Sequence, residues 1–139
     1  MHLQHQWGSV LVAAVLGGLV SVTAVVAGAQ FLPVLGVREG AARSTVIPIN
    51  KGFLDSLTLL NERDGGINGV RLGWEECETV YDVDRGVACY ERLKTKGLTG
   101  AVAFHAVGTP LASALTERAR HDQIPLLTVG IGRADAADG

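Results

Sequence analysis

Aromatic residues and dense positive charge are both scarce in this 139-residue chain. Phe, Trp and Tyr make up only 5% of it, and the formal net charge is −2 with a pI near 6.0. Lys and Arg form no dense patch along the sequence. Proteins that bind nucleic acid rely on basic surfaces and, for single strands, on aromatic stacking platforms. The composition therefore argues against a nucleic-acid partner.

The sequence also lacks the short motifs of common enzymes and metal sites. It has no G-x-S-x-G nucleophile turn, no P-loop and no C-x-x-C pair. Gly130 and Gly132 form a G-x-G, but Asp135 replaces the third glycine of a dinucleotide fingerprint, which indicates a plain turn. His105 lies in an apolar run, as a core or rim histidine does. We therefore expect no catalytic residue, no cofactor and no metal.

The N-terminal segment carries no Asp, Glu, Lys or Arg before Arg38, although His2 and His5 lie near its start. Residues 9–26 are all apolar or small, and an Ala-Gly-Ala tripeptide ending at Ala29 fits the cleavage pattern of a secretory signal. The sequence therefore predicts a signal peptide over residues 1–29 and a periplasmic or extracytoplasmic protein. The apolar run is long and no Lys or Arg precedes it, so a retained membrane anchor is the alternative.

Residues 30–139 alternate between strand and helix patterns and are predicted to form one domain. Apolar runs predict strands at 31–37, 70–77, 100–107 and 124–129. Glu75, Glu76 and Glu78 are expected to form a solvated strand end. The β-α-β order predicts an α/β fold with a doubly wound parallel sheet.

Three helices are predicted between these strands. The first should open at Pro48 and end at the glycine turn Gly65-Gly66, where positive φ is available. The second should start at Asp82 or Asp84 and run to about Lys96. The third should run to about Asp122, with the Thr109 hydroxyl as its N-terminal cap and Pro110 in its first turn.

Ligands of doubly wound sheets bind beyond the C-terminal ends of the strands. Three segments rich in small residues are predicted there, at 38–47, 106–109 and 130–135. Small residues let backbone N–H groups approach a ligand, and helix N-termini favour an anion such as a carboxylate. The same residue types are ordinary loop formers, so spacing alone does not decide between a binding site and plain turns.

Several segments resemble substrate-binding proteins of branched-chain amino-acid ABC transporters. In those proteins the first helix runs into a Gly-Gly-Ile-x-Gly turn that leads to the second strand. This chain has Gly-Gly-Ile-Asn-Gly at 65–69. The resemblance spans 30–139 and continues in the segments 75–79 with Tyr81-Asp82, 86–94, 124–127 and 130–133. The resemblance implies part of the N-terminal lobe of a type I periplasmic binding protein, whose two lobes close on a ligand at a hinge. Family members are about three times longer, so we expect a fragment of such a protein.

The resemblance also implies a ligand, a partner and a set of contact residues. The ligand would be an amino acid of branched-chain type, or a related amide or urea, and the partner an ABC transporter permease. The protein would contact a membrane only through its N-terminal segment or through the transporter. The candidate ligand-binding residues are Ser44, Thr45, Gly108, Thr109, Gly130 and Gly132. A receptor ectodomain that senses a ligand, and a flavodoxin-like enzyme, are the alternative readings.

Cys77 and Cys89 are the two cysteines of the chain. An exported protein meets an oxidising compartment, and the two residues fall in a strand and in the helix that follows it. The sequence therefore predicts a disulfide that closes a short loop, worth about 3 kcal/mol in the chain-entropy model. Two buried free thiols or a metal pair are the alternatives.

Overall fold

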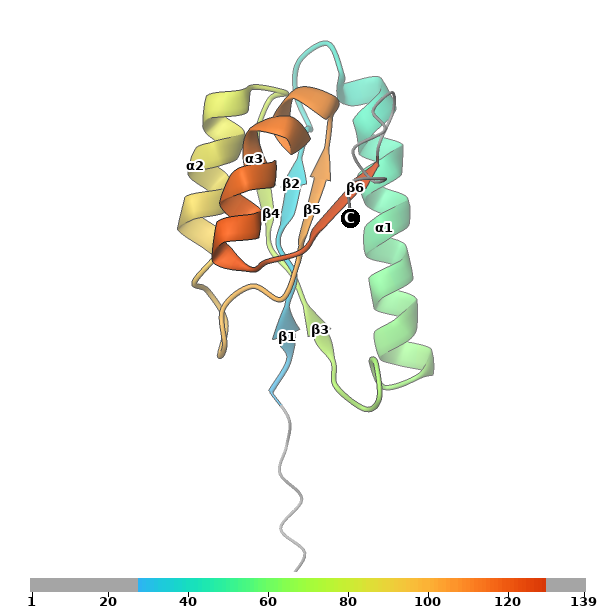
Figure 1. Ribbon diagram of the computed structural model, residues 1–139. Helices are drawn as coiled ribbons and strands as arrows, with labels where there is room; N and C mark the ends of the chain where they lie inside the picture. Colours follow the sequence, from blue (N-terminus) through green and yellow to red (C-terminus); the bar gives the residue numbers. More distant parts are fainter. Residues whose placement is uncertain (1–27, 130–139) are drawn as a thin grey trace, which may run out of the picture.

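The computed structural model describes residues 28–129, which alternate between parallel strands and helices (Figure 1). The predicted signal segment lies almost entirely outside these residues. Within them, no helix combines the length and the apolar character that crossing a membrane requires. The elements in chain order are β1 (Gln30–Phe31), β2 (Val34–Gly36), α1 (Arg43–Arg63), β3 (Leu72–Gly73), β4 (Glu76–Glu78), α2 (Val83–Leu93), β5 (Phe104–Val107), α3 (Thr109–Asp122) and β6 (Leu126–Val129).

The main sheet has four parallel strands in the order β4-β2-β5-β6. Helix α1 covers one face of the sheet, and α2 and α3 cover the other (Figure 1). The predicted doubly wound α/β fold is therefore confirmed. The order of connection reverses between β2 and β5, so the crevice beyond their C-terminal ends is where ligands of such folds bind.

The first predicted strand is divided in two by Pro33. Pro33 has no N–H to donate to a ladder, so β1 ends at Phe31 and pairs with β3, whereas β2 starts at Val34 and pairs with β4 and β5. The prediction of one strand over 31–37 was wrong, and so was that of one strand over 70–77. Pro33 still contributes its carbonyl, which accepts a 2.9 Å hydrogen bond from the His105 N–H.

Helix α1 starts five residues earlier than predicted. Pro48 lies inside the helix rather than at its first position, so one backbone hydrogen bond to the Ser44 carbonyl is absent. The extra turn is stabilised by Val46, which is 2% exposed and packs with Val37 and Val107. Burial of that side chain offsets the missing bond, since a fully buried Val contributes about 1.5–3 kcal/mol.

The larger core lies between the sheet and the pair α2–α3. Tyr90 and Leu93 of α2 are fully buried there with Phe104, and the rings of Tyr90 and Phe104 lie 4.6 Å apart. Asp82 caps α2 by accepting a 2.8 Å bond from the Arg85 N–H, as predicted for that residue. The helix ends at Leu93, three residues before the predicted end. Because this core anchors β5 and α3, it holds the crevice beyond β5 in place.

Candidate ligand-binding site

A pocket of about 210 Å³ lies beyond the C-terminal ends of β5 and β6, beside the start of α1. The two helices whose starts border it, α1 and α3, follow β2 and β5, the strands between which the strand order reverses. Most of its walls are apolar, and no acidic or basic side chain of the described residues lines it. The lining residues are Ala42, Thr45, Val46, Ile49, Tyr81, Val107, Gly108, Thr109 and Val129.

Three of the residues predicted from sequence meet at this pocket. Thr45 comes from the first turn of α1, and Gly108 and Thr109 come from the start of α3. Ser44 is in the same first turn of α1 but does not line the pocket. The predicted Gly130 and Gly132 lie outside the described residues.

Two helices begin beside the pocket, and neither start is capped by a side chain. Ala42 is the N-cap of α1 and Gly108 is that of α3. The prediction that Thr109 is the cap was therefore wrong: Thr109 is the first helical residue, and Gly108 takes the cap with φ +110°. The Arg43 and Thr45 N–H groups already donate to the carbonyls of Gly40 and Ala42, and Pro110 has no N–H. The positive end of a helix dipole nevertheless favours an anion, so a carboxylate would suit this end of the pocket.

Gly108 and Tyr81 fit together across the pocket. A Cβ on Gly108 would lie 2.8 Å from Cε2 of the Tyr81 ring, a distance that real Cβ contacts do not reach. The φ of +110° is also one that glycine adopts without strain. Gly108 therefore serves as the N-cap of α3 and also leaves the space that the Tyr81 ring occupies. In the sequence Tyr81 is visible only as part of the family resemblance, and its place at the pocket was not predicted.

The turn before α2 holds Tyr81 in an unusual backbone conformation. Val80 and Tyr81 have φ of +49° and +64°, which is rare for β-branched and bulky residues. The Glu78 carboxylate fixes this turn, because it accepts bonds from the N–H of Val80 (2.6 Å) and of Arg38 (2.7 Å). The Thr79 hydroxyl donates to the Gly36 carbonyl at 3.0 Å and accepts from the Tyr81 N–H at 3.3 Å.

The acidic residues around β4 are paired rather than merely solvated, which corrects the sequence prediction. Glu75 forms ion pairs with Arg92 (2.8 Å) and Lys96 (2.6 Å), and hydrogen bonds from Lys96 and then Arg92 lower its pKa. Glu76 pairs with Arg38 at 2.6 Å. These pairs lie along the edge strand β4, away from the pocket.

A second hollow, of about 200 Å³, lies on the other flank of α1 and has a different character. Charged side chains line much of it, including the paired Arg38 and Glu76. Asn50 also lines it, and the buried Oδ1 of its side chain has no hydrogen-bond partner. It contains none of the residues predicted to bind a ligand.

His105 is a core histidine, as predicted. It is 4% exposed and stacks on Phe53 of α1, with ring centroids 4.0 Å apart. Burial lowers its pKa, which keeps the ring neutral at physiological pH. His105 does not line the pocket, and residues 28–129 contain no group of three or more His, Cys, Asp or Glu that could hold a metal ion.

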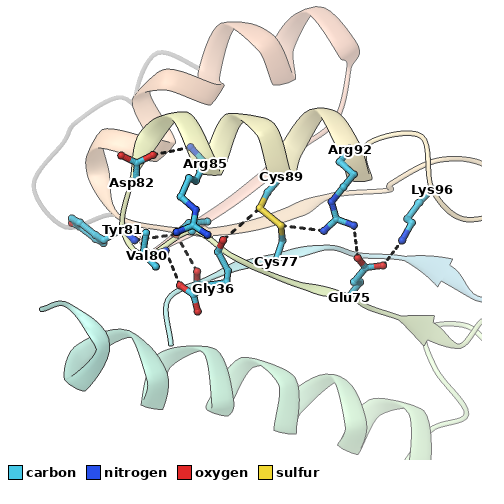
Figure 2. The surroundings of a disulfide bond; sticks show 12 residues. Gly36, Glu75, Cys77, Val80, Tyr81, Asp82, Arg85, Cys89, Arg92 and Lys96 are labelled. Atoms are coloured by element: carbon cyan, nitrogen blue, oxygen red, sulfur yellow. Dashed lines mark hydrogen bonds and ion pairs between the residues drawn. A yellow bond between two sulfur atoms is a disulfide. The ribbon is translucent and has the colours of Figure 1, made fainter. Parts of the chain in front are cut away.

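The predicted disulfide is confirmed. Cys77 of β4 and Cys89 of α2 are bonded, with Cα atoms 5.9 Å apart. Figure 2 shows Arg92 beside this bridge, where its Nη2 donates to Sγ of Cys77 at 3.1 Å while its Nη1 contacts Glu75. The bridge ties the edge strand to α2 and so supports the turn that carries Tyr81.

Comparison with solved structures finds the same fold in larger proteins. A protein described as an ABC transporter permease from the Pseudomonas fluorescens group is 45% identical, with a TM-score of 0.67 over 78% of this chain and 26% of its own. A fatty acid ABC transporter substrate-binding protein from Thermomonospora curvata is 20% identical, with a TM-score of 0.66 over 74% of this chain and 25% of its own. A possible leucine/isoleucine/valine-binding protein from Rhodopirellula baltica SH 1 is 19% identical, with a TM-score of 0.61 over 73% of this chain and 27% of its own.

These neighbours confirm the resemblance seen in the sequence, since ABC-transporter substrate-binding proteins share the fold of this chain. The chain spans about a quarter of the length of each structure. No model of a protein family and no curated protein matches the sequence.

Proposed function

We propose that this chain forms one side of an extracytoplasmic solute-binding site that serves uptake by an ABC transporter. In this proposal residues 1–29 are the export signal and 30–139 are part of the N-terminal lobe. The partner is the transporter permease, and the ligand is an amino acid of branched-chain type or a related small polar solute. The chain is a binding protein and not an enzyme.

The observation that carries the proposal is the pocket at the C-terminal edge of the sheet. Two helices start there, and they bring the hydroxyl residues Thr45 and Thr109 to the pocket. The remaining wall is apolar. Such a pocket suits a ligand with one carboxylate or amide end and one uncharged apolar end.

The residues have separate roles in this arrangement. The hydroxyls of Thr45 and Thr109 would hold the carboxylate beside the positive end of the α3 dipole, and Gly108 lets the ligand approach the backbone. Val46, Ile49 and Val129 would contact the apolar end. We propose Ser44, Gly130 and Gly132, which the family resemblance also implies, as further contributors.

The pocket volume bears on the expected affinity. About 210 Å³ is below the roughly 300–1,000 Å³ of sites that enclose a drug-sized ligand. A second lobe would supply the remaining contacts and exclude water. The chain by itself should therefore bind with a dissociation constant on the order of 1 mM or weaker.

The test is a titration of the ¹⁵N-labelled chain, followed by amide chemical shifts. L-leucine, L-valine, acetamide and urea are added separately, because the proposal allows both amino acids and amides. Shifts that saturate at Thr45, Gly108 and Thr109 support the site. Shifts that are absent for all four probes, or that occur only at residues remote from the pocket, contradict it.

A further inference from the structure

Tyr81 combines exposure with a backbone that the surrounding residues hold under strain. It is 47% exposed, whereas the other tyrosine of the chain, Tyr90, is fully buried. Two consecutive non-glycine residues, Val80 and Tyr81, have positive φ, a conformation that is strained for side chains of this size. The chain holds them with the Glu78 carboxylate and the Thr79 hydroxyl.

The space around the ring is shaped for it as well. Gly108 has no Cβ at the point where one would meet the ring. The ring lines the main pocket and also borders a small hollow with Thr79, Pro110 and Leu111. Figure 2 shows Tyr81 just before the start of α2, with its ring directed away from the disulfide. A ring that only filled the core would be buried, whereas this one forms a wall of an open pocket.

We infer, resting on the solute-binding function proposed above, that Tyr81 is a specificity-determining residue of this pocket. Its ring is the surface on which the apolar part of the ligand packs. Thr45 and Thr109 contact the polar end. The ligands selected by the ring are therefore small carboxylates or amides with an uncharged aliphatic or aromatic group, and those with a charged side chain are discriminated against.

The chemistry of the walls supports this ligand class. The described residues that line the pocket include no charge that could pair with a cationic or anionic side chain. A buried charge without a partner is strongly disfavoured. An aromatic face, in contrast, gains free energy when a ligand's aliphatic or aromatic group covers it and removes apolar surface from water.

The experiment compares the wild-type chain with Tyr81→Gly by the same amide-shift titration. The probes are L-leucine, which has an apolar side chain, and the amino acid glycine, which has none. We expect Tyr81→Gly to weaken L-leucine binding by about threefold to tenfold and to leave glycine binding unchanged. L-lysine and L-glutamate should bind the wild-type chain no better than glycine does.

The ratio of the L-leucine affinity to the glycine affinity distinguishes a role of Tyr81 in specificity from a role in folding. Glycine at position 81 accepts positive φ without strain, so the unfolding midpoint of Tyr81→Gly should not fall. Tyr81→Asn, which also tolerates this conformation, is the second variant, and Tyr81→Phe should retain the selectivity. Leu98→Ala, at an exposed apolar residue outside the pocket, is the matched control and should change neither affinity.

The outcomes distinguish this inference from the function on which it rests. If the wild-type chain binds both probes and the ratio is the same in Tyr81→Gly and Tyr81→Asn, Tyr81 does not determine specificity and the solute-binding proposal stands. If both probes weaken equally in the variants, the ring has a structural role only. If no probe shifts the wild-type chain at the pocket, the proposed function is wrong and the role of Tyr81 is wrong with it.

Discussion

The hydroxyl of Tyr90 donates a 3.0 Å hydrogen bond to Oδ2 of Asp122, which joins the buried face of α2 to the last residue of α3. Lys94 contacts the same carboxylate oxygen at 2.8 Å. The two helices that carry the larger core are thereby fixed to each other at one end. Because α3 starts at the candidate pocket, this contact also helps to set the position of the pocket residues.

The acid sensitivity of the fold should depend on Asp122. Hydrogen bonds from Lys94, His121 and Tyr90, in that order, lower the pKa of Asp122 to about 2. That value is below the roughly 3.9 of an unfolded chain, so the stabilisation is fully present above about pH 4 and is lost as the pH falls through about 2. Asp122→Asn should therefore lower the thermal unfolding midpoint at pH 7, with a smaller effect at pH 2.

The control is Glu117→Gln, an exposed acid on the same helix. Its unfolding midpoint should follow that of the wild-type chain across the pH range. A stability difference for Asp122→Asn that is independent of pH would show that the carboxylate charge is not the cause.

Loss of the disulfide should destabilise the chain by about 3 kcal/mol in the chain-entropy model, since it closes a short loop. Urea unfolding with and without a reductant measures this difference. The double variant Cys77→Ala, Cys89→Ala should have the stability of the reduced chain and should not respond to reductant. Equal stability of the oxidised and reduced wild-type chains would contradict a structural role for the bridge.

Replacing a helical glycine by alanine should lower the stability of the fold at Gly86 and raise it at Gly52. A Cβ at Gly86 would overlap the Leu111 side chain at the contact between α2 and α3, so Gly86→Ala should cost about 1–3 kcal/mol. Gly52 lies inside α1 with nothing within 4 Å of such a Cβ, so Gly52→Ala should stabilise by about 0.5–1 kcal/mol. Chemical denaturation of both variants tests the packing, and a loss of stability at Gly52 would refute it.

Thr109→Ala should weaken ligand binding more than it weakens the fold. Loss of a hydrogen bond to a charged group costs about 1.5–3 kcal/mol, or roughly tenfold to a hundredfold in affinity. Thr116→Ala is the control, because its hydroxyl donates to the Ala112 carbonyl on the same helix, outside the pocket. Binding is followed by the L-leucine titration and stability by urea unfolding. If Thr109→Ala loses stability at unchanged affinity, the residue serves the helix alone.

Export should remove the first 29 residues. The apolar run and the Ala-Gly-Ala tripeptide predict cleavage between Ala29 and Gln30. N-terminal sequencing of the exported protein should therefore begin at Gln30. A product that starts at Met1 and stays with the membrane fraction would favour the retained anchor.

Short-range patterns in the sequence were sufficient to predict much of the architecture. The alternation of apolar runs with helical patterns predicted the parallel α/β fold, because strand and helix periodicities depend on neighbouring residues alone. The Asp82 cap, the end of α3 at Asp122 and the pairing of Cys77 with Cys89 followed from short-range signals of the same kind. The rule that loops at one sheet edge meet predicted the segments 38–47 and 106–109 there, and the family resemblance singled out Thr45, Gly108 and Thr109 within them.

Only the tertiary structure decided the features that depend on contacts distant in sequence. The first turn of α1 extends past Pro48 because Val46 is buried against Val37 and Val107. The place of Tyr81 at the pocket depends on the space above Gly108, 27 positions away in sequence, and on a turn fixed by Glu78 and Arg38. The sequence by itself therefore determined the order of elements and the sheet edge at which the pocket lies, while long-range packing decided which side chains form its wall.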